Sequence, residues 1–138
     1  MITKIETQED VVGLLSVFNE VWGAETLSEL IVSLQETTCL LYKTPEIAGY
    51  IFYGYDSRGF VEITDLGISA KFRNKGYGKK LVQYVCNLAD TICLSVKVDN
   101  KAAQSIYTSV GFIPKYTVHN YYGVGNDGLR MEWSKKEV

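Results

Sequence analysis

The amino-acid sequence predicts a mixed α/β (α+β) domain built on one central sheet, with its elements in the order βααβββαβαββ. Capped amphipathic segments follow a short first strand, β-branched and aromatic runs fill the middle, and helical and strand-like segments alternate in the second half. The chain has 138 residues, of which 46% are hydrophobic, and this is enough material for one packed core. We therefore expect a single domain over residues 1–138.

Capping signals predict two helices near the N-terminus. Residues 7–10 (TQED) and 26–29 (TLSE) both have the Thr-x-x-acid form of a capping box, which satisfies backbone N–H groups at the start of a helix. Apolar residues at helical spacing follow each box. Residues 21–25 (VWGAE) break the pattern, so we expect a short irregular segment between the two helices.

The middle of the chain predicts strands. Runs rich in β-branched and aromatic residues cover 37–43, 47–55 and 60–69, and turn compositions separate them, as in an antiparallel meander. An amphipathic segment over 81–88 then leads to a strand-like run over 91–98. A helix between two strands forms a crossover, so the strands on either side of it should be parallel.

The last third predicts one more helix and a hairpin. Asp99 or Asn100 is placed to cap the helix, and Gly111 is placed to end it. Two strand-like runs, 112–122 and 128–134, flank a Gly/Asn loop. We expect these two runs to pair with each other.

Charge and cysteine content exclude several classes of function. Fourteen Lys and Arg against sixteen Asp and Glu give a net charge of −2, so we expect no nucleic-acid and no membrane partner. The N-terminal residues lack the order of a signal peptide, and no apolar run approaches the roughly 20 residues that span a bilayer, so we expect a cytoplasmic protein. Cys39, Cys86 and Cys93 have no Cys-x-x-Cys spacing, and His119 is the only histidine, so we expect buried free thiols and no metal site.

Residues 73–81 (RNKGYGKKL) predict an anion site, because two glycines stand among four cations at the start of a helix. The Walker A loop does not fit, since Gly78 is followed by two lysines and no hydroxyl residue. The dinucleotide fingerprint fits in part: Asp99 lies about 20 residues on, but Leu81 stands where the third glycine belongs.

A third pattern fits best, Arg/Gln-x-x-Gly-x-Gly/Ala at a strand-to-helix junction, with Arg73, Gly76 and Gly78. Residues 100–112 (NKAAQSIYTSVGF) add a second motif, Asn-x-x-Ala-x-x-x-Tyr-x-x-x-Gly-Phe. Together these motifs resemble the GNAT superfamily of acetyl-CoA-dependent N-acetyltransferases. The resemblance covers about residues 61–112 and, more faintly, the C-terminal hairpin.

The resemblance implies the GNAT fold, a mostly antiparallel sheet of about seven strands with helices on both faces. Its one parallel pair would splay apart to admit the pantetheine arm of acetyl-CoA, and the glycine-rich loop would wrap the pyrophosphate. The Ile68 backbone N–H would polarise the thioester carbonyl. The cofactor-binding residues implied are Leu66, Ile68, Arg73, Asn74, Lys75, Gly76, Tyr77, Gly78, Lys79, Asn100 and Tyr107.

The resemblance also implies the groups that move protons in a direct transfer from acetyl-CoA to a primary amine. Tyr107 would protonate the leaving thiolate. Glu62 would accept the proton of the amine, because it stands six residues before Ile68, and even spacing places both on one face of a strand. Other members carry the base in the next strand, where this chain has Ser95, so the assignment of the base stays open.

Acceptor specificity in the family comes from the segment between the first two helices and from the last hairpin. The residues implied are Trp22, Glu25, Tyr121 and Tyr122. The paired tyrosines resemble the C-terminal end of ribosomal-protein-type N-terminal acetyltransferases, which favours a protein N-terminal amine as substrate. A small amine such as a polyamine or aminoglycoside is the alternative, and a non-catalytic acyl-CoA sensor is another. The protein would be a monomer or a homodimer.

Overall fold

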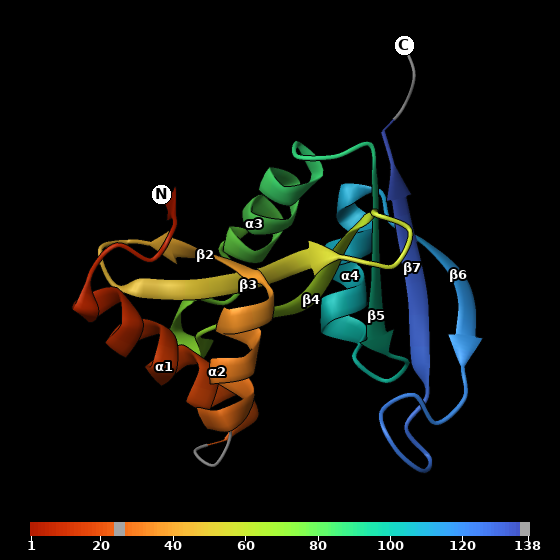
Figure 1. Ribbon diagram of the computed structural model, residues 1–138, viewed down its shortest axis with the longest axis horizontal. Helices are drawn as coiled ribbons and strands as arrows, with labels where there is room; N and C mark the ends of the chain where they lie inside the picture. The colour runs from red at the N-terminus through yellow and green to blue at the C-terminus, as the bar shows by residue number, and fades with distance from the viewer. Residues whose placement is uncertain (24–26, 136–138) are drawn as a thin grey trace.

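The computed structural model describes residues 1–23 and 27–135 of the chain, and its elements follow the order βααβββαβαββ (Figure 1). The elements are β1 (Ile2–Thr3), α1 (Gln8–Trp22), α2 (Leu27–Glu36), β2 (Thr38–Lys43), β3 (Ile47–Tyr55), β4 (Val61–Ile68), the 3-10 turn η1 (Ala70–Phe72), α3 (Tyr77–Cys86), β5 (Thr91–Lys97), α4 (Lys101–Val110), β6 (Ile113–Val118) and β7 (Gly128–Ser134). The predicted fold class and element order are confirmed.

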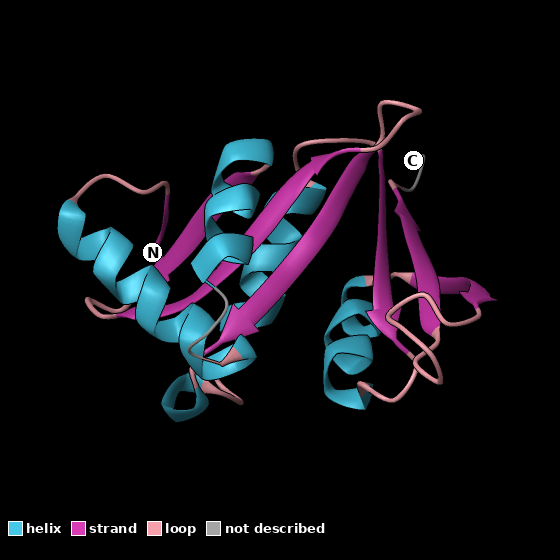
Figure 2. Ribbon diagram, turned by 60° about the horizontal axis from the view of Figure 1, so that its bottom comes forward, coloured by secondary structure: helices cyan, strands magenta, loops and turns pink. Residues whose placement is uncertain are grey.

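Seven strands form one sheet in the order β1-β2-β3-β4-β5-β7-β6. Only β4 and β5 pair in parallel, and they do so over three residue pairs, from Val61↔Ile92 to Ile63↔Leu94. Beyond this short contact the two strands separate, and Figure 2 shows the sheet dividing there into two diverging sets of strands. The last two strands pair as the predicted hairpin, and β7 lies between β5 and β6.

Helices cover both faces of the sheet, and each face has its own core (Figure 1). On one face α1 and α2 pack on β2 and β3 through Leu14, Phe18, Leu30, Tyr50 and Phe52. On the other face α3 and α4 pack on the central strands, with a core that extends across both halves of the sheet. The three cysteines are free and buried, as predicted.

The helix ends follow the capping signals in the sequence. Thr7 and Asp10 form the predicted capping box of α1, and the Asn100 side chain accepts a hydrogen bond from the Ala103 N–H at the start of α4. Gly111 ends α4 with φ +116°. The second predicted box begins at Thr26, which lies outside the described residues.

A β-bulge in β4 changes which side chains share a face. Phe52 pairs with Asp65 and Tyr53 pairs with Ile63, so Thr64 is an extra residue on β4. Glu62 and Asp65 therefore both lie on the α1/α2 face, whereas Ile68 packs into the core on the α3/α4 face. The expectation that even spacing places Glu62 and Ile68 on one face is wrong, because the bulge shifts the alternation by one residue.

Candidate active site

The glycine-rich loop joins β4 to α3 and turns sharply twice. Asn74 (φ +63°) and Gly76 (φ +81°) both adopt the left-handed conformation, and α3 begins at the next residue, Tyr77. A Cβ on Gly76 would meet no atom within 4 Å, so this position faces open space. The first N–H groups of a helix have no intrahelical partner and carry the positive end of its dipole. The loop therefore offers backbone donors to an anion.

A cavity of about 480 Å³ opens in front of this loop. Its walls come from β4, the loop, the first turn of α3, α4 and the end of α1. The predicted cofactor-binding residues among its lining are Leu66, Ile68, Arg73, Asn74, Gly76, Tyr77, Gly78, Lys79 and Asn100. Lys75 and Tyr107 are the two predicted residues that lie outside the lining.

Aromatic and polar contacts fix the shape of the loop. The ring of Tyr77 stacks on Tyr42 of β2 with centroids 4.2 Å apart, and the Lys80 ammonium lies 5.9 Å from the Tyr42 ring. Arg73 Nε donates a hydrogen bond to the Ile68 carbonyl at 3.3 Å. The first turn of α3 thus packs on β2, and the loop before it is hydrogen-bonded to the end of β4.

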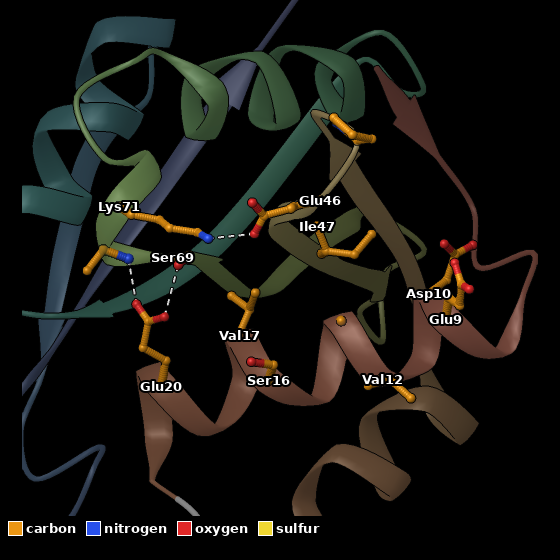
Figure 3. Close-up of a pocket in the computed structure, with 13 residues that line it drawn as sticks. Glu9, Asp10, Val12, Ser16, Val17, Glu20, Glu46, Ile47, Ser69 and Lys71 are labelled. Atoms are coloured by element: carbon orange, nitrogen blue, oxygen red, sulfur yellow. Dashed lines mark hydrogen bonds and ion pairs between the residues drawn. The ribbon is translucent and has the colours of Figure 1, made fainter.

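A second cavity, of about 670 Å³, is lined by residues of α1, the turn between β2 and β3, and η1 (Figure 3). Its charged lining is mainly acidic, with Glu9, Asp10, Glu20 and Glu46 against Lys71. Negative charges repel phosphate groups, so this cavity is the poorer site for a nucleotide cofactor.

Glu20 connects this second cavity to the glycine-rich loop. Its carboxylate accepts hydrogen bonds from the Ser69 hydroxyl and the Ala70 N–H, both at the start of η1 (Figure 3). The Ala70 N–H in particular lowers the pKa of Glu20. Sequence reasoning missed Glu20, because its partners lie 49 and 50 residues further along the chain.

Tyr107 lies on α4 and is buried, with 5% of its surface exposed, and its ring packs against Phe112. Burial raises the pKa of this phenol, and the negative charge of Asp65 and the nearby Tyr122 raise it further. The phenol therefore keeps its proton at neutral pH.

Glu62, the predicted proton acceptor, is held in an ion pair. Its carboxylate lies 2.8 Å from Arg130 Nη1 of β7. The same guanidinium lies 3.1 Å from the Ser95 hydroxyl and 3.0 Å from the Cys93 sulfur. Glu62 and Ser95, the two positions at which the family resemblance places a base, thus both contact Arg130. Sequence reasoning missed this arginine.

Asp65 is a second carboxylate on the same face of β4, and sequence reasoning missed it as well. Trp22 Nε1 donates to its Oδ2 at 2.8 Å, and the Tyr50 hydroxyl donates to the same oxygen at 2.9 Å. Burial raises the pKa of Asp65. The sequence did contain a signal for Asp65. It is the second acidic residue in the strand over residues 61–68, and its neighbours in that strand are mostly apolar.

Two of the remaining predicted acceptor residues are described by the structure. Tyr121 and Tyr122 make an edge-to-face contact in the loop between β6 and β7, with ring centroids 4.8 Å apart. Burial raises the pKa of Tyr122 to about 12. Tyr121, Asp65 and Glu62 raise this pKa further, whereas the positive charge of Arg130 lowers it. Glu25 lies outside the described residues.

Two further observations concern the described part of the chain. Within residues 1–23 and 27–135, no helix is long and apolar enough to span a membrane. The same residues contain no group of three or more His, Cys, Asp or Glu that could hold a metal ion.

Comparison with known proteins gives matches in sequence. The model of the acetyltransferase (GNAT) family matches residues 6–112. The N-alpha-acetyltransferase 30 of Xenopus laevis is 31% identical over 80 residues, which are 54% of this chain and 29% of that protein. The matched stretch thus spans less than a third of that relative's length.

Solved structures match over nearly the whole chain. A GNAT-family acetyltransferase from Bacillus cereus superposes with a TM-score of 0.84 at 20% identity, over 99% of this chain and 98% of that one. The ribosomal-protein-S18-alanine N-acetyltransferase of Escherichia coli gives 0.75 at 17% identity, over 100% and 95%. A Bacillus subtilis acetyltransferase in complex with CoA gives 0.76 at 19% identity, over 98% of both chains. At these identities the likeness establishes the fold.

Proposed function

Because this chain belongs to the acetyltransferase (GNAT) family, we propose that it transfers the acetyl group of acetyl-CoA to a primary amine, by direct attack within a ternary complex. The observation that carries the proposal is the cavity in front of the α3 N-terminus. Backbone N–H donors and cationic side chains line this cavity together with the last residues of β4. Such a helix start suits a pyrophosphate.

The residues around this cavity fit the cofactor by their chemistry. Gly76 leaves room for a phosphate to approach the backbone, and Arg73 and Lys79 supply positive charge. Leu66 and Ile68 would lie beside the pantetheine arm, and the Asn100 side chain would contact it in addition to capping α4. Bound there, the cofactor would supply the activated acetyl group.

Proton transfer completes the proposed reaction. Tyr107 would give its phenolic proton to the departing sulfur, since its raised pKa keeps it protonated until charge develops beside it. A β4 carboxylate would take a proton from the amine before attack. Glu62, the residue selected from the sequence, stays a prediction in this role.

For the acceptor we propose the N-terminal α-amine of a protein. The similarity to N-alpha-acetyltransferase 30 in sequence and to the ribosomal-protein-S18-alanine N-acetyltransferase in structure supports this choice. Trp22, Tyr121 and Tyr122 would line the acceptor side, where aromatic rings can pack against a peptide backbone. A small amine is the second candidate, because the carboxylates of Glu62 and Asp65 on one face would also suit a polycation. A cytoplasmic location stays a prediction from the sequence.

The test is thiol release from acetyl-CoA by the purified protein, with N-terminal peptides, polyamines, aminoglycosides and free amino acids as acceptors. Peptide-dependent release supports the proposal, whereas faster release with a small amine supports the second candidate. If coenzyme A binds by calorimetry and no acceptor reacts, the protein is a cofactor-binding sensor and the proposal is wrong.

A further inference from the structure

Asp65 occupies a distinctive position in the sheet. The pairing of β4 with β5 ends at Ile63, the bulge adds Thr64, and Asp65 is the first residue beyond it. The next residue, Leu66, already lines the cavity before α3, as does Val21, the neighbour of Trp22. The Asp65–Trp22 contact therefore lies where β4 and β5 separate, next to residues that line the cavity.

The charge of this carboxylate acts on residues of both halves of the sheet. Burial is the main cause that raises the pKa values of Cys39, Tyr50, Tyr107 and Tyr122, and the charge of Asp65 raises each of them further. These four groups lie on β2, β3, α4 and the loop after β6. Trp22 and Tyr50, the side-chain partners of Asp65, are neutral donors that both bond its Oδ2. Among the ion pairs of the described residues, none involves Asp65.

Glu62 differs in the feature that matters for a base. Its carboxylate is already paired with Arg130, whose side chain is only 16% exposed and whose Nη1 lies 2.8 Å away. Protonation of Glu62 would leave this poorly solvated guanidinium without its counter-ion. Protonation of Asp65 breaks no ion pair. Of the two carboxylates, Asp65 is also the one whose charge acts on Tyr107.

We propose that Asp65, rather than Glu62, takes the proton of the acceptor amine, and that Trp22 and Tyr50 are positioning residues that hold its Oδ2. The inference rests on the proposed acetyl transfer and names the base of that site. Glu62 and Arg130 then form a structural ion pair that joins β4 to β7.

The proton steps balance as follows. One N–H bond of the acceptor ammonium breaks, and its proton passes to the Asp65 carboxylate. The freed lone pair forms the C–N bond to the acetyl carbon while the C–S bond breaks, and the sulfur takes the phenolic proton of Tyr107. The second proton of the nitrogen returns to the Tyr107 phenolate, and Asp65 releases its proton to water.

The kinetic test compares Asp65→Asn with Glu62→Gln on the best acceptor of the wild-type protein. Asparagine keeps the shape and an acceptor oxygen for Trp22 and Tyr50 but does not take a proton. We expect Asp65→Asn to lower kcat/KM roughly 100-fold or more at pH 7, as for loss of a general base. The deficit should shrink as the pH rises through the pKa of the acceptor, about 8 for an α-amine. Calorimetry should find an unchanged affinity for acetyl-CoA.

The same pH profiles decide between the two carboxylates. Wild-type kcat/KM should fall at acid pH as Asp65 binds a proton, and Glu62→Gln should keep this profile with a smaller loss. If Glu62→Gln shows the large loss that recovers at high pH, or if Asp65→Asn keeps the wild-type rate at pH 7, the inference is wrong. Absence of wild-type turnover with every acceptor contradicts the proposed function instead.

A second measurement needs no substrate. Trp22 and Trp133 are the two tryptophans of the chain, so a Trp133→Phe background leaves the fluorescence of the indole that bonds Asp65. We expect its emission to change with a midpoint above about pH 4, the ordinary value for an aspartate, since burial favours the neutral carboxyl. Asp65→Asn should abolish that midpoint. A titration that is missing, or that persists in Asp65→Asn, overturns the inference even when no acceptor has been found.

Discussion

The Glu20 carboxylate on the last turn of α1 lies 2.9 Å from the hydroxyl of Ser69, the residue that joins β4 to η1. The same carboxylate accepts the Ala70 N–H, so a helix on one face of the sheet holds the backbone that leads into the glycine-rich loop. The geometry of the proposed phosphate site thus depends on a residue that does not line it.

We predict that Glu20→Ala weakens acetyl-CoA binding roughly 3- to 10-fold, because two hydrogen bonds to a charged acceptor are lost and the loop gains freedom. Glu46→Ala is the matched control in the same cavity. Its exposed ion pair with Lys71 should contribute little, so we expect a change below about 2-fold. Calorimetry with acetyl-CoA measures both, and equal effects of the two variants would contradict the role given to Glu20.

Alanine variants of two glycines distinguish the cost of a left-handed backbone from the loss of cofactor contact. Gly76 (φ +81°) and Gly59 (φ +82°) have nearly the same positive φ, and a Cβ on either meets no atom within 4 Å. Gly76→Ala and Gly59→Ala should each lower the free energy of unfolding by about 1 kcal/mol, the cost of the left-handed conformation. Only Gly76 lines the cavity, so only Gly76→Ala should also weaken acetyl-CoA binding. Unchanged affinity in Gly76→Ala would remove the loop from the phosphate site.

For Tyr107→Phe we predict a fall in kcat of roughly 100-fold or more with little change in acetyl-CoA affinity, because the ring is kept and the phenolic proton is lost. Tyr84→Phe on α3 is the control, since Tyr84 is 43% exposed, whereas Tyr107 is buried. Steady-state kinetics and calorimetry together make the test. A Tyr107→Phe variant with the kcat of the Tyr84→Phe control would exclude the phenol as proton donor.

Acid stability should depend on Asp10. The hydrogen bond from Lys43, aided by the Glu6 and Thr7 N–H groups, lowers the pKa of Asp10 from 3.8 to about 2. A lowered folded-state pKa gives stability that is complete above the unfolded value and is lost as the pH falls through the folded one. Thermal unfolding should therefore show Asp10→Asn less stable at pH 7, with a difference that closes between about pH 4 and pH 2.

The control for this prediction is Asp90→Asn, an exposed aspartate whose side chain makes no hydrogen bond or ion pair within residues 1–23 and 27–135. It should keep the wild-type dependence of Tm on pH. A gap between wild type and Asp10→Asn that stays constant down to pH 2 would show that the carboxylate acts by something other than its charge.

Local signals in the sequence predicted most of the fold. The Thr7 capping box, the Asn100 cap and the strand over residues 47–55 all depend on residues within a few positions of one another. The glycine-rich loop belongs to the same class, because its residues are contiguous and meet at one cavity. Short-range chemistry determines each of these features.

Long-range pairing determines the rest. The bulge at Thr64 exists only through the register of β4 against β3, so the alternation of β4 could not be read correctly from its own residues. Arg130 meets Glu62 across 68 residues of sequence. The contacts of Asp65 likewise join β4 to α1 and β3. The proposed acceptor side of the site thus depends on tertiary contacts, whereas the proposed cofactor side depends mostly on residues that are close in sequence.

The short parallel pairing of β4 and β5 also has a consequence for cooperativity. With three residue pairs between them, few backbone hydrogen bonds tie the two halves of the sheet together, although the core beneath α3 and α4 spans both. An extended ligand with amide groups, seated between the parted strands, would add pairing that the chain itself lacks. Its binding should slow amide hydrogen exchange in β4 and β5 together, so that the halves open as one unit. Each release of product would then remove this added pairing between β4 and β5. The rate of product release would therefore depend on how readily the two halves of the sheet separate.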